Sequence, residues 1–285
     1  MAEAAERCSD LSRAAGERLA GSAPWVDRWL LVEVPGRWPR DVGSGDGLSD
    51  ASRATVQRWR ESSSERRRLL FVRRPGRAAG QRLAFVVRAQ EDVAEVRRIE
   101  LGTGRDLADV DLERAGDRTE APLVLVCGHG SRDACCARRG TAVYDSLASQ
   151  LGDEELWISS HHGGHRFAAN MIALPAGLHF GRVEPNEAGE IVESALAGRI
   201  DLGNYRGRTC YAPSVQAVEH AIRSAHGLDR VEQLALVGVD GARVTFRTSK
   251  GESYGAEVVE TEGPSVPPGC GEPPKTQAAW DVRLV

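Results

Sequence analysis

The fold is decided by the segment Leu123-Val-Leu-Val-Cys127-Gly-His-Gly-Ser-Arg-Asp-Ala-Cys135-Cys136. Its first four residues are a continuous apolar run, which is typical of a strand buried on both faces. A helix is predicted from Ala134 to Leu151, and Asp133 is suited to cap its free amides. A strand that ends in a cysteine and a helix that starts with two more bring three thiols to one edge of a sheet.

A second motif, His161-His-Gly-Gly-His165, follows the predicted strand Glu155–Ile158. Three of the chain's seven histidines lie within these five positions. The two glycines allow the backbone to turn tightly, so that both outer rings can point at one ion. A lone cysteine or histidine is usually a packed side chain. The clustering of both kinds at strand ends favours a metal site, since such loops are held by a rigid scaffold.

Two thiolates and two imidazoles are the ligand set of a zinc site or an iron–sulfur cluster. Arg132 and the start of the helix favour the thiolate form that binds metal. The candidate ligands are Cys127, Cys136, His161 and His165, with Cys135 as the alternative to Cys136. The neighbours expected to support these ligands without binding the metal are His129, Arg132 and His162.

The composition is that of a soluble globular protein, with 285 residues, 41% hydrophobic and 27% charged. A net charge of -4 gives no reason to expect a nucleic-acid partner. No apolar run approaches the roughly 20 residues that span a bilayer, and the N-terminus lacks the features of a secretory signal. Six unevenly placed cysteines do not resemble a disulfide framework. We therefore expect a cytoplasmic protein with no membrane partner.

The chain is expected to be α/β and to divide into residues 1–119, 120–203 and 204–285. The first part is a small α/β unit, and the second has the order β-α-β-β-β-α of a thioredoxin-like fold. The third is a helix with a β-rich extension that packs on the other two, and its tail Gly263–Lys275 is expected to be irregular. The remaining predicted strands are Trp29–Val34, Arg68–Val72, Leu83–Arg88, Asn170–Leu174, Leu178–Val183, Leu234–Val237, Arg243–Arg247 and Ala256–Val259. The remaining predicted helices are Leu48–Ser62, Pro185–Leu196 and Pro213–His226.

Several stretches resemble the sucrase/ferredoxin-like family of thioredoxin-fold proteins. The two central motifs, extended to Cys127–Gly140 and Ser160–Asn170, carry most of the resemblance. It continues through nearly the whole chain, in Cys8–Arg13, Trp29–Gly36, Leu174–Val183 and Tyr205–Arg208.

The resemblance implies a thioredoxin-like ferredoxin domain that holds a [2Fe-2S] cluster on two cysteines and a His-x3-His pair. It implies Cys127, Cys136, His161 and His165 as ligands, and it favours Cys136 over Cys135 by its spacing from Cys127. The implied function is soluble electron transfer, with a separate reductase as donor and an unknown acceptor protein, rather than an enzyme with its own substrate.

Imidazole ligands lower the negative charge of such a cluster. In Rieske centres the same replacement gives potentials of roughly -150 to +300 mV, against about -400 mV for all-cysteine plant-type clusters. Because a bound imidazole keeps a second N–H, we hypothesise that reduction is coupled to proton uptake at His161 or His165.

Two other functions stay open. One is a thiol-based redox enzyme that uses Cys127 with Cys135 or Cys136, and the other is a structural Cys2His2 zinc module. Sugar hydrolysis would need two carboxylates flanking one pocket, and the sequence marks no such pair. Three cysteines lie outside these motifs and could form a further redox or structural pair: Cys8, Cys210 and Cys270. Isolated thiols are the expectation for them, because nothing in the sequence places them together.

Overall fold

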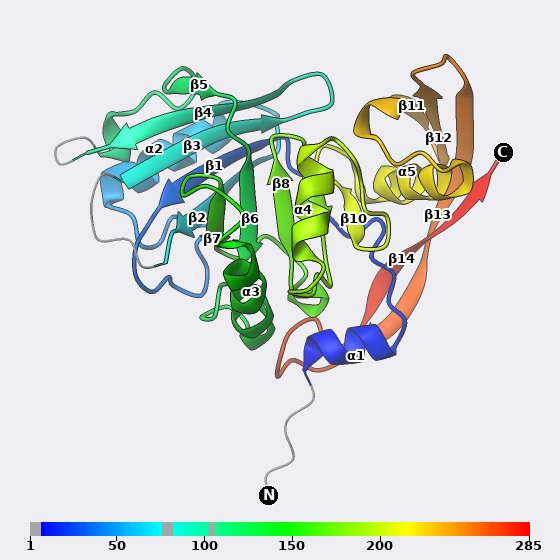
Figure 1. Cartoon of the computed structure of the whole chain (residues 1–285), viewed down its shortest axis with the longest axis horizontal. Helices are drawn as coiled ribbons and strands as arrows, with labels where there is room; N and C mark the ends of the chain where they lie inside the picture. Colours follow the sequence, from blue (N-terminus) through cyan, green and yellow to red (C-terminus); the bar gives the residue numbers. More distant parts are fainter. Residues whose placement is uncertain (1–6, 76–81, 103–105) are drawn as a thin grey trace, which may run out of the picture.

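The computed structural model describes residues 7–75, 82–102 and 106–285. Ten strands form one large sheet in the order β10-β9-β8-β6-β7-β2-β1-β3-β4-β5, and four more form a second sheet in the order β11-β12-β13-β14. Figure 1 shows the small sheet beside the β10 end of the large one. The predicted α/β class with a β-rich C-terminal extension is confirmed.

The first half of the large sheet contains every element predicted for it. Ser49 caps the helix α2 by accepting a hydrogen bond from the N–H of Ser52. Two further strands, β4 and β5, were not predicted, because the charged residues between the apolar positions of β4 obscure its alternation. The elements are β1 (Arg28–Glu33), α2 (Asp50–Glu61), β2 (Arg67–Arg73), β3 (Arg82–Ala89), β4 (Ala94–Leu101), η1 (Leu107–Asp109) and β5 (Asp117–Thr119).

The second half has the predicted β-α-β-β-β-α order. Its strands lie in the order β9-β8-β6-β7, with β6 parallel to β7 and β8 antiparallel to both β6 and β9. Helices α3 and α4 lie in front of these strands in the view of Figure 1. The elements are β6 (Leu123–Cys127), α3 (Ala134–Leu147), β7 (Leu156–Ser159), η2 (His165–Phe167), β8 (Met171–Leu174), β9 (Leu178–Phe180) and α4 (Ala188–Leu196).

Helix α3 ends earlier than predicted. Its last residue is Leu147 rather than Leu151. The chain leaves the helix through a tight turn, in which the N–H of Gln150 donates to the carbonyl of Leu147. The apolar side chain of Leu151 still packs against the core, which explains why its position fitted the helical pattern.

Strands β2 and β7 join the two halves into one sheet. They pair antiparallel, with Val72 opposite Ser159. One buried apolar cluster contains side chains from both halves, including Trp29 and Trp157. The predicted boundary between residues 119 and 120 therefore lies within a continuous sheet, and the division into three domains stays a prediction.

The C-terminal part corrects one prediction. The tail Gly263–Lys275 is not irregular throughout, because β13 continues to Val266 and β14 starts at Lys275. Glycine and proline masked this pairing, which has an irregular register between Glu262 and Ser265. The elements are β10 (Tyr205–Arg208), α5 (Pro213–His226), η3 (Val231–Gln233), β11 (Leu234–Asp240), β12 (Arg243–Thr248), β13 (Ser253–Val266) and β14 (Lys275–Leu284).

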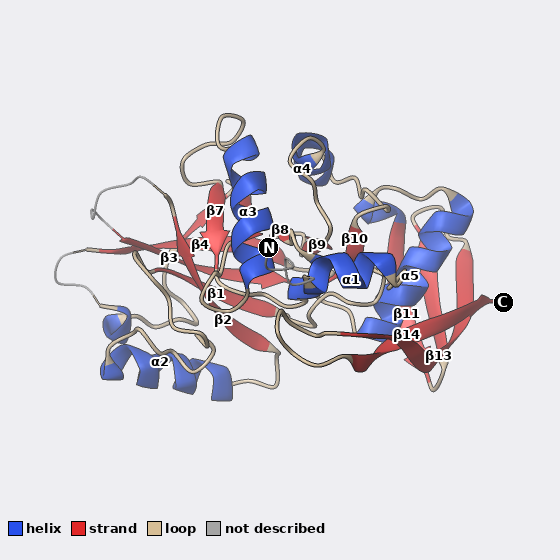
Figure 2. Cartoon of the chain, turned by 90° about the horizontal axis from the view of Figure 1, so that it is seen from below, coloured by secondary structure: helices blue, strands red, loops and turns tan. Residues whose placement is uncertain are grey.

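One short helix, α1 (Cys8–Ala14), lies apart from its neighbours in sequence. In both Figure 1 and Figure 2 it lies beside the lower end of α3, near the loop between β13 and β14. This placement brings α1 and the loop between β13 and β14, which are far apart in sequence, to the cysteine-bearing helix. Among the described residues, no helix has the length and apolar character to cross a membrane.

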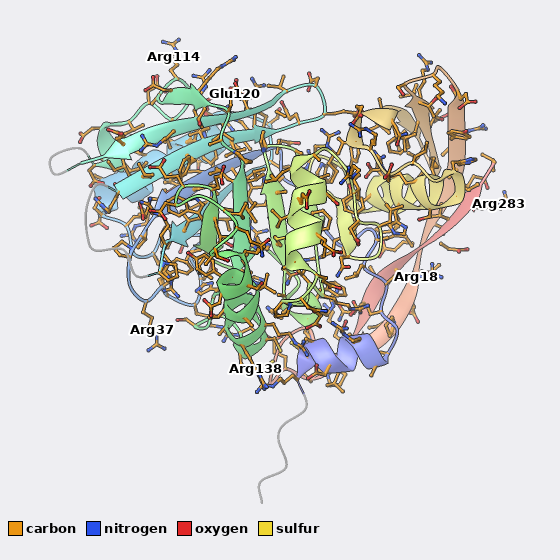
Figure 3. The ribbon with its side chains drawn as sticks, in the orientation of Figure 1. Arg18, Arg37, Arg114, Glu120, Arg138 and Arg283 are labelled. Carbon is orange, nitrogen blue, oxygen red and sulfur yellow. The ribbon has the colours of Figure 1, made fainter. Side chains whose placement is uncertain are left out.

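Charged side chains are spread over the surface. Figure 3 shows labelled arginines at separate edges of the molecule, among them Arg37, Arg114 and Arg283. The absence of a nucleic-acid partner stays a prediction.

Candidate metal centre

Three of the predicted ligands come together at the end of β6. The Nδ1 atom of His161 lies 3.9 Å from the Sγ of Cys127 and 3.8 Å from the Sγ of Cys136. The three ligating atoms all lie within 4.8 Å of one another. Both cysteines are buried and the histidine is half-buried. This is a compact, mostly enclosed group of two soft sulfurs and one imidazole nitrogen.

The sheet and helix α3 create this convergence. Because β6 and β7 are parallel, with Cys127 opposite Ser159, the loops that follow them open at the same edge. Helix α3 packs very closely on this edge at Gly140, where a Cβ atom would lie 1.9 Å from the carbonyl oxygen of Cys127. A glycine here therefore lets the helix bring Cys136 to the strand end.

His165 lies next to this group without belonging to the closest three atoms. Its ring centroid is 4.8 Å from that of His161. Its Nδ1 atom is buried and has no hydrogen-bond partner among the residues that the structure describes. Gly163 and Gly164 hold the turn between the rings, with φ of +111° and +69°. An unpartnered buried nitrogen on a ring next to that of His161 fits the predicted role of His165 as a metal ligand.

The ionisation of the group also suits metal binding. Burial lowers the pKa of His161 to about 4, so its ring is neutral at neutral pH. A hydrogen bond from the Cys136 thiol and another from His161 hold the pKa of Cys127 well below its usual value. The same thiolate, together with burial, raises the pKa of Cys136. The low pKa of Cys127 favours the thiolate form that binds metal, and metal binding would displace the proton that Cys136 holds.

The half-buried Arg68 and the buried Arg206 hold the histidine loop and offset the thiolate charge. Arg68 donates to the carbonyl of His161 at 3.0 Å, and Arg206 donates to the carbonyl of Gly163 at 3.0 Å and to the Oδ1 of Asn170 at 2.7 Å. Burial lowers the pKa of Arg68 to about 10 and that of Arg206 to about 9, so both stay cationic at neutral pH. Their positive charge favours thiolate at Cys127, whose charge acts on both in return.

The predicted neighbours of the ligands lie around the loop. His129 accepts a hydrogen bond from the backbone N–H of His161 on Nδ1, at 3.1 Å, and contacts the carbonyl of Pro39 with Nε2, at 2.9 Å. His162 faces away from the thiols and pairs with His179, with 2.9 Å between the two ring nitrogens. Arg132 is close enough to lower the pKa of His129 further, after burial. These contacts position the ligand loop, and the ligand and neighbour roles stay predictions.

The two adjacent cysteines of α3 face different groups. Successive helical residues point about 100° apart, so Cys136 faces Cys127 while Cys135 faces Cys8 and Cys270. The prediction that Cys8 and Cys270 are isolated thiols is therefore wrong, because tertiary packing brings α1 and the loop between β13 and β14 to α3. Cys210 is not in either group. Cys8 was already part of the family resemblance, which was the one signal in the sequence that could have marked it.

The chain belongs to the sucrase/ferredoxin-like family, whose sequence model matches residues 19–207. The match includes both central motifs and all the predicted ligands of the first group. No solved structure matches the chain significantly.

Three curated relatives have the same name, Altered inheritance of mitochondria protein 32. The chain is 32% identical to the protein of Eremothecium gossypii over 46% of each chain. It is 35% identical to the Debaryomyces hansenii protein over 30% of this chain and 35% of the relative. It is 37% identical to the Clavispora lusitaniae protein over the same shares. The matched region thus spans less than half of each relative's length.

These names correct the predicted function. The relatives are named for altered inheritance of mitochondria, and their names describe no ferredoxin. The prediction of a soluble electron-transfer protein was drawn from the ferredoxin part of the family resemblance. Membership in the family supports the shared motifs and the fold, and it does not extend to that activity.

Proposed function

We propose that the chain is a metal-binding protein and that Cys127, Cys136, His161 and His165 hold its cofactor. The observation that supports this most directly is the convergence of two thiols and one imidazole within 4.8 Å at a buried sheet edge. The unpartnered Nδ1 of His165, whose ring lies 4.8 Å from that of His161, would supply a second imidazole donor.

We propose a [2Fe-2S] cluster as the cofactor. A donor set of two thiolates and two neutral imidazoles fits it, and a bound cluster would be a one-electron redox group. The residues around it would keep the ligands ready: Arg68 and Arg206 hold the loop and balance the thiolate charge, and His129 fixes the backbone of His161. The proposal concerns binding of the cofactor and assigns no electron-transfer role.

The cytoplasm stays the proposed compartment. All six cysteines are free thiols in the structure, including five that lie within the two close groups. Neighbouring thiols persist in this state in a reducing compartment. The predicted reductase and acceptor stay predictions.

The test is the metal content of protein purified without oxygen. Iron and acid-labile sulfide are measured, together with the visible spectrum and the electron paramagnetic resonance of the reduced protein. We expect two irons and two sulfides per chain, the content of a [2Fe-2S] cluster. Two matched variants distinguish the ligands from other histidines: His165→Ala should lower iron content sharply, and His220→Ala, on α5, should leave it unchanged.

The proposal has a clear contrary result. If the protein holds no iron or sulfide after anaerobic reconstitution, the cluster is excluded. If it then takes up zinc in a manner that depends on Cys127 and His161, metal binding stands and the cofactor is corrected. Failure to bind either metal at these residues would overturn the proposed function.

A further inference from the structure

A second cluster of ligating side chains lies outside the centre described above. It contains the thiols of Cys8, Cys135 and Cys270 and the carboxylate of Asp133. The Sγ atom of Cys135 lies 3.6 Å from that of Cys8 and 3.2 Å from that of Cys270, and the third sulfur pair is 3.5 Å apart. The three sulfurs therefore form a nearly equilateral triangle, with one ligating atom of Asp133 within 4.8 Å of each.

This geometry is close to one face of a tetrahedral metal site. Zinc–sulfur bonds of about 2.3 Å in a tetrahedron place the sulfurs about 3.8 Å apart. The observed separations of 3.2–3.6 Å need only a small expansion around an ion. The carboxylate oxygens of Asp133 lie 3.9 and 4.0 Å from the Sγ of Cys8, which is within reach of the fourth position.

The protein holds the fourth donor rigidly. Asp133 caps helix α3 by accepting the N–H of Cys135 at 2.8 Å, and its other oxygen accepts the N–H of Cys270, also at 2.8 Å. The carboxylate is buried, although both oxygens keep lone pairs that could face an ion. It thus links the start of α3 to the loop between β13 and β14.

The chemistry of the cluster also favours a cation. Three sulfurs and the buried carboxylate of Asp133 lie together, with their ligating atoms within 4.8 Å of one another. A buried carboxylate is stable when it is paired with a positive group or coordinates a metal.

We propose that Cys8, Cys135, Cys270 and Asp133 bind one zinc ion. The ion would take the place of the protons on the cysteine thiols, which pass to solvent. Four protein ligands leave no open position for substrate, so the site would be structural. It would tie three segments together: α1, the start of α3, and the loop between β13 and β14, which lie side by side in Figure 1.

The zinc site would also hold the loop between β13 and β14 against His165 of the first candidate metal centre. A Cβ atom on Gly269, next to Cys270, would lie 2.8 Å from the Nε2 of His165. Glycine therefore allows the loop to pass directly against that ring. The proposed zinc site is independent of the proposed cluster, and its ligands are different.

The first experiment uses the wild-type chain, loaded with Co²⁺ as a spectroscopic probe in place of zinc. Binding should produce a thiolate-to-cobalt charge-transfer band with the intensity of three Co–S bonds, and zinc should displace it at one equivalent per chain. A band with the intensity of two Co–S bonds would place the metal at Cys127 and Cys136 instead and would overturn the second site.

Variants then identify the ligands. We expect Cys8→Ser and Cys270→Ser to weaken zinc binding by more than about tenfold in competition with a chelator, since even outer partners of a metal contribute that much. Cys210→Ser, outside the cluster, is the matched control and should bind zinc as the wild type does. Circular dichroism shows whether each variant is folded, and the half-buried Cys270 is the site where replacement perturbs packing least.

The outcomes separate this proposal from the first. Iron and sulfide content should be retained in Cys270→Ser, whereas zinc should be retained in His161→Ala. If zinc affinity is the same in Cys8→Ser, Cys270→Ser and the wild type, the second site is wrong and the cluster proposal is untouched. If peptide mapping of freshly purified, metal-supplied protein finds two of the three thiols in a disulfide, the cluster is a redox pair and the zinc site is likewise overturned.

Discussion

The two groups of potential metal ligands meet at the neighbouring residues Cys135 and Cys136 of α3, but the sequence builds them in different ways. Cys127, Cys136 and His161 come from the ends of neighbouring elements, within 34 residues of one another. Cys8 and Cys270 are separated by 262 positions and meet because α1 and the loop between β13 and β14 both lie against the start of α3. The first group therefore depends on the local geometry of the sheet edge. The second group depends on long-range packing between α1, α3 and the β13–β14 loop. Changes that affect α3, the histidine loop and the chain ends should consequently have different effects.

The largest effect is expected from Gly140→Val, which should disrupt both groups. The new side chain would collide with the backbone of Cys127, so α3 would have to move away from β6 and shift Cys135 and Cys136 together. We expect the free energy of unfolding to fall by more than about 3 kcal/mol, the upper end of ordinary overpacking. Urea denaturation measures this change.

The control for this substitution is Gly238→Ala in β11, where a Cβ atom would meet nothing within 4 Å. It should be close to wild type in stability. A Gly140→Val protein with unchanged stability and metal content would show that the close helix packing does not hold the two groups together.

Replacement of Arg206 by methionine should affect the first group and spare the second. It would leave the carbonyl of Gly163 and the side chain of Asn170 without their buried donor. We expect the free energy of unfolding to fall by about 2–3 kcal/mol, because hydrogen bonds from charged donors are among the stronger ones. Iron content should fall and zinc content should remain.

The exposed Arg247 of β12 is the matched control. Arg247→Met should change neither stability nor metal content. Equal loss of iron and zinc in Arg206→Met would mean that the two groups are not structurally separate.

Acid should weaken the histidine loop in particular. Burial keeps the pKa of His162 and of His179 well below the usual value, with Arg68 and Arg206 as further causes. Unfolded histidine takes up a proton near pH 6.5, whereas the folded pair stays neutral. The unfolded state thus binds more protons as the pH falls, and stability is lost below about pH 6.5.

Denaturation of the metal-free protein between about pH 7 and about pH 5 tests this dependence, since that range brackets the unfolded histidine pKa. His179→Gln should lose less stability over this range than the wild type does, and His220→Gln should behave like the wild type. An unchanged pH dependence in His179→Gln would exclude the buried pair as its source.

The smallest effect is expected from Arg139→Gln, which loosens only the docking of α1. Arg139 pairs with Asp10 and Glu184 and donates to the hydroxyl of Ser9. Because these pairs are partly exposed, we expect less than about 1 kcal/mol of global stability to be lost. Trypsin should nevertheless cut faster at Arg13, since α1 would detach more often.

Arg138→Gln is the control, because this neighbour on α3 extends outward (Figure 3). Its cleavage rate should match that of the wild type. Zinc should slow cleavage in both proteins if the second group clamps α1, and no protection by zinc would count against the clamp.

Much of the fold could be predicted from the sequence, because strands with continuous apolar runs and capped helices have local signals. The strands β1, β2, β3, β6 and β7 and helix α5 were found within a residue or two of their bounds. Strand β4, which pairs with β3, and strand β14, which pairs with β13, were missed. Exposed or half-exposed strands with interrupting charges lack a clear alternation of apolar and polar residues. Their pairing is long-range and supplies the stability that the local pattern does not show.

The closeness of the residues in the first group was determined by the sequence itself. Each of its motifs follows a buried strand, and parallel strands must open their carboxyl ends at the same edge of a sheet. The closeness of Cys127, Cys136 and His161 thus follows from local patterns. Tertiary structure alone decided that Cys135 turns away from this group towards Cys8 and Cys270. No local sequence pattern relates α1 to the β13–β14 loop. Only the packing of both segments on α3 brings the thiols of Cys8 and Cys270 to Cys135.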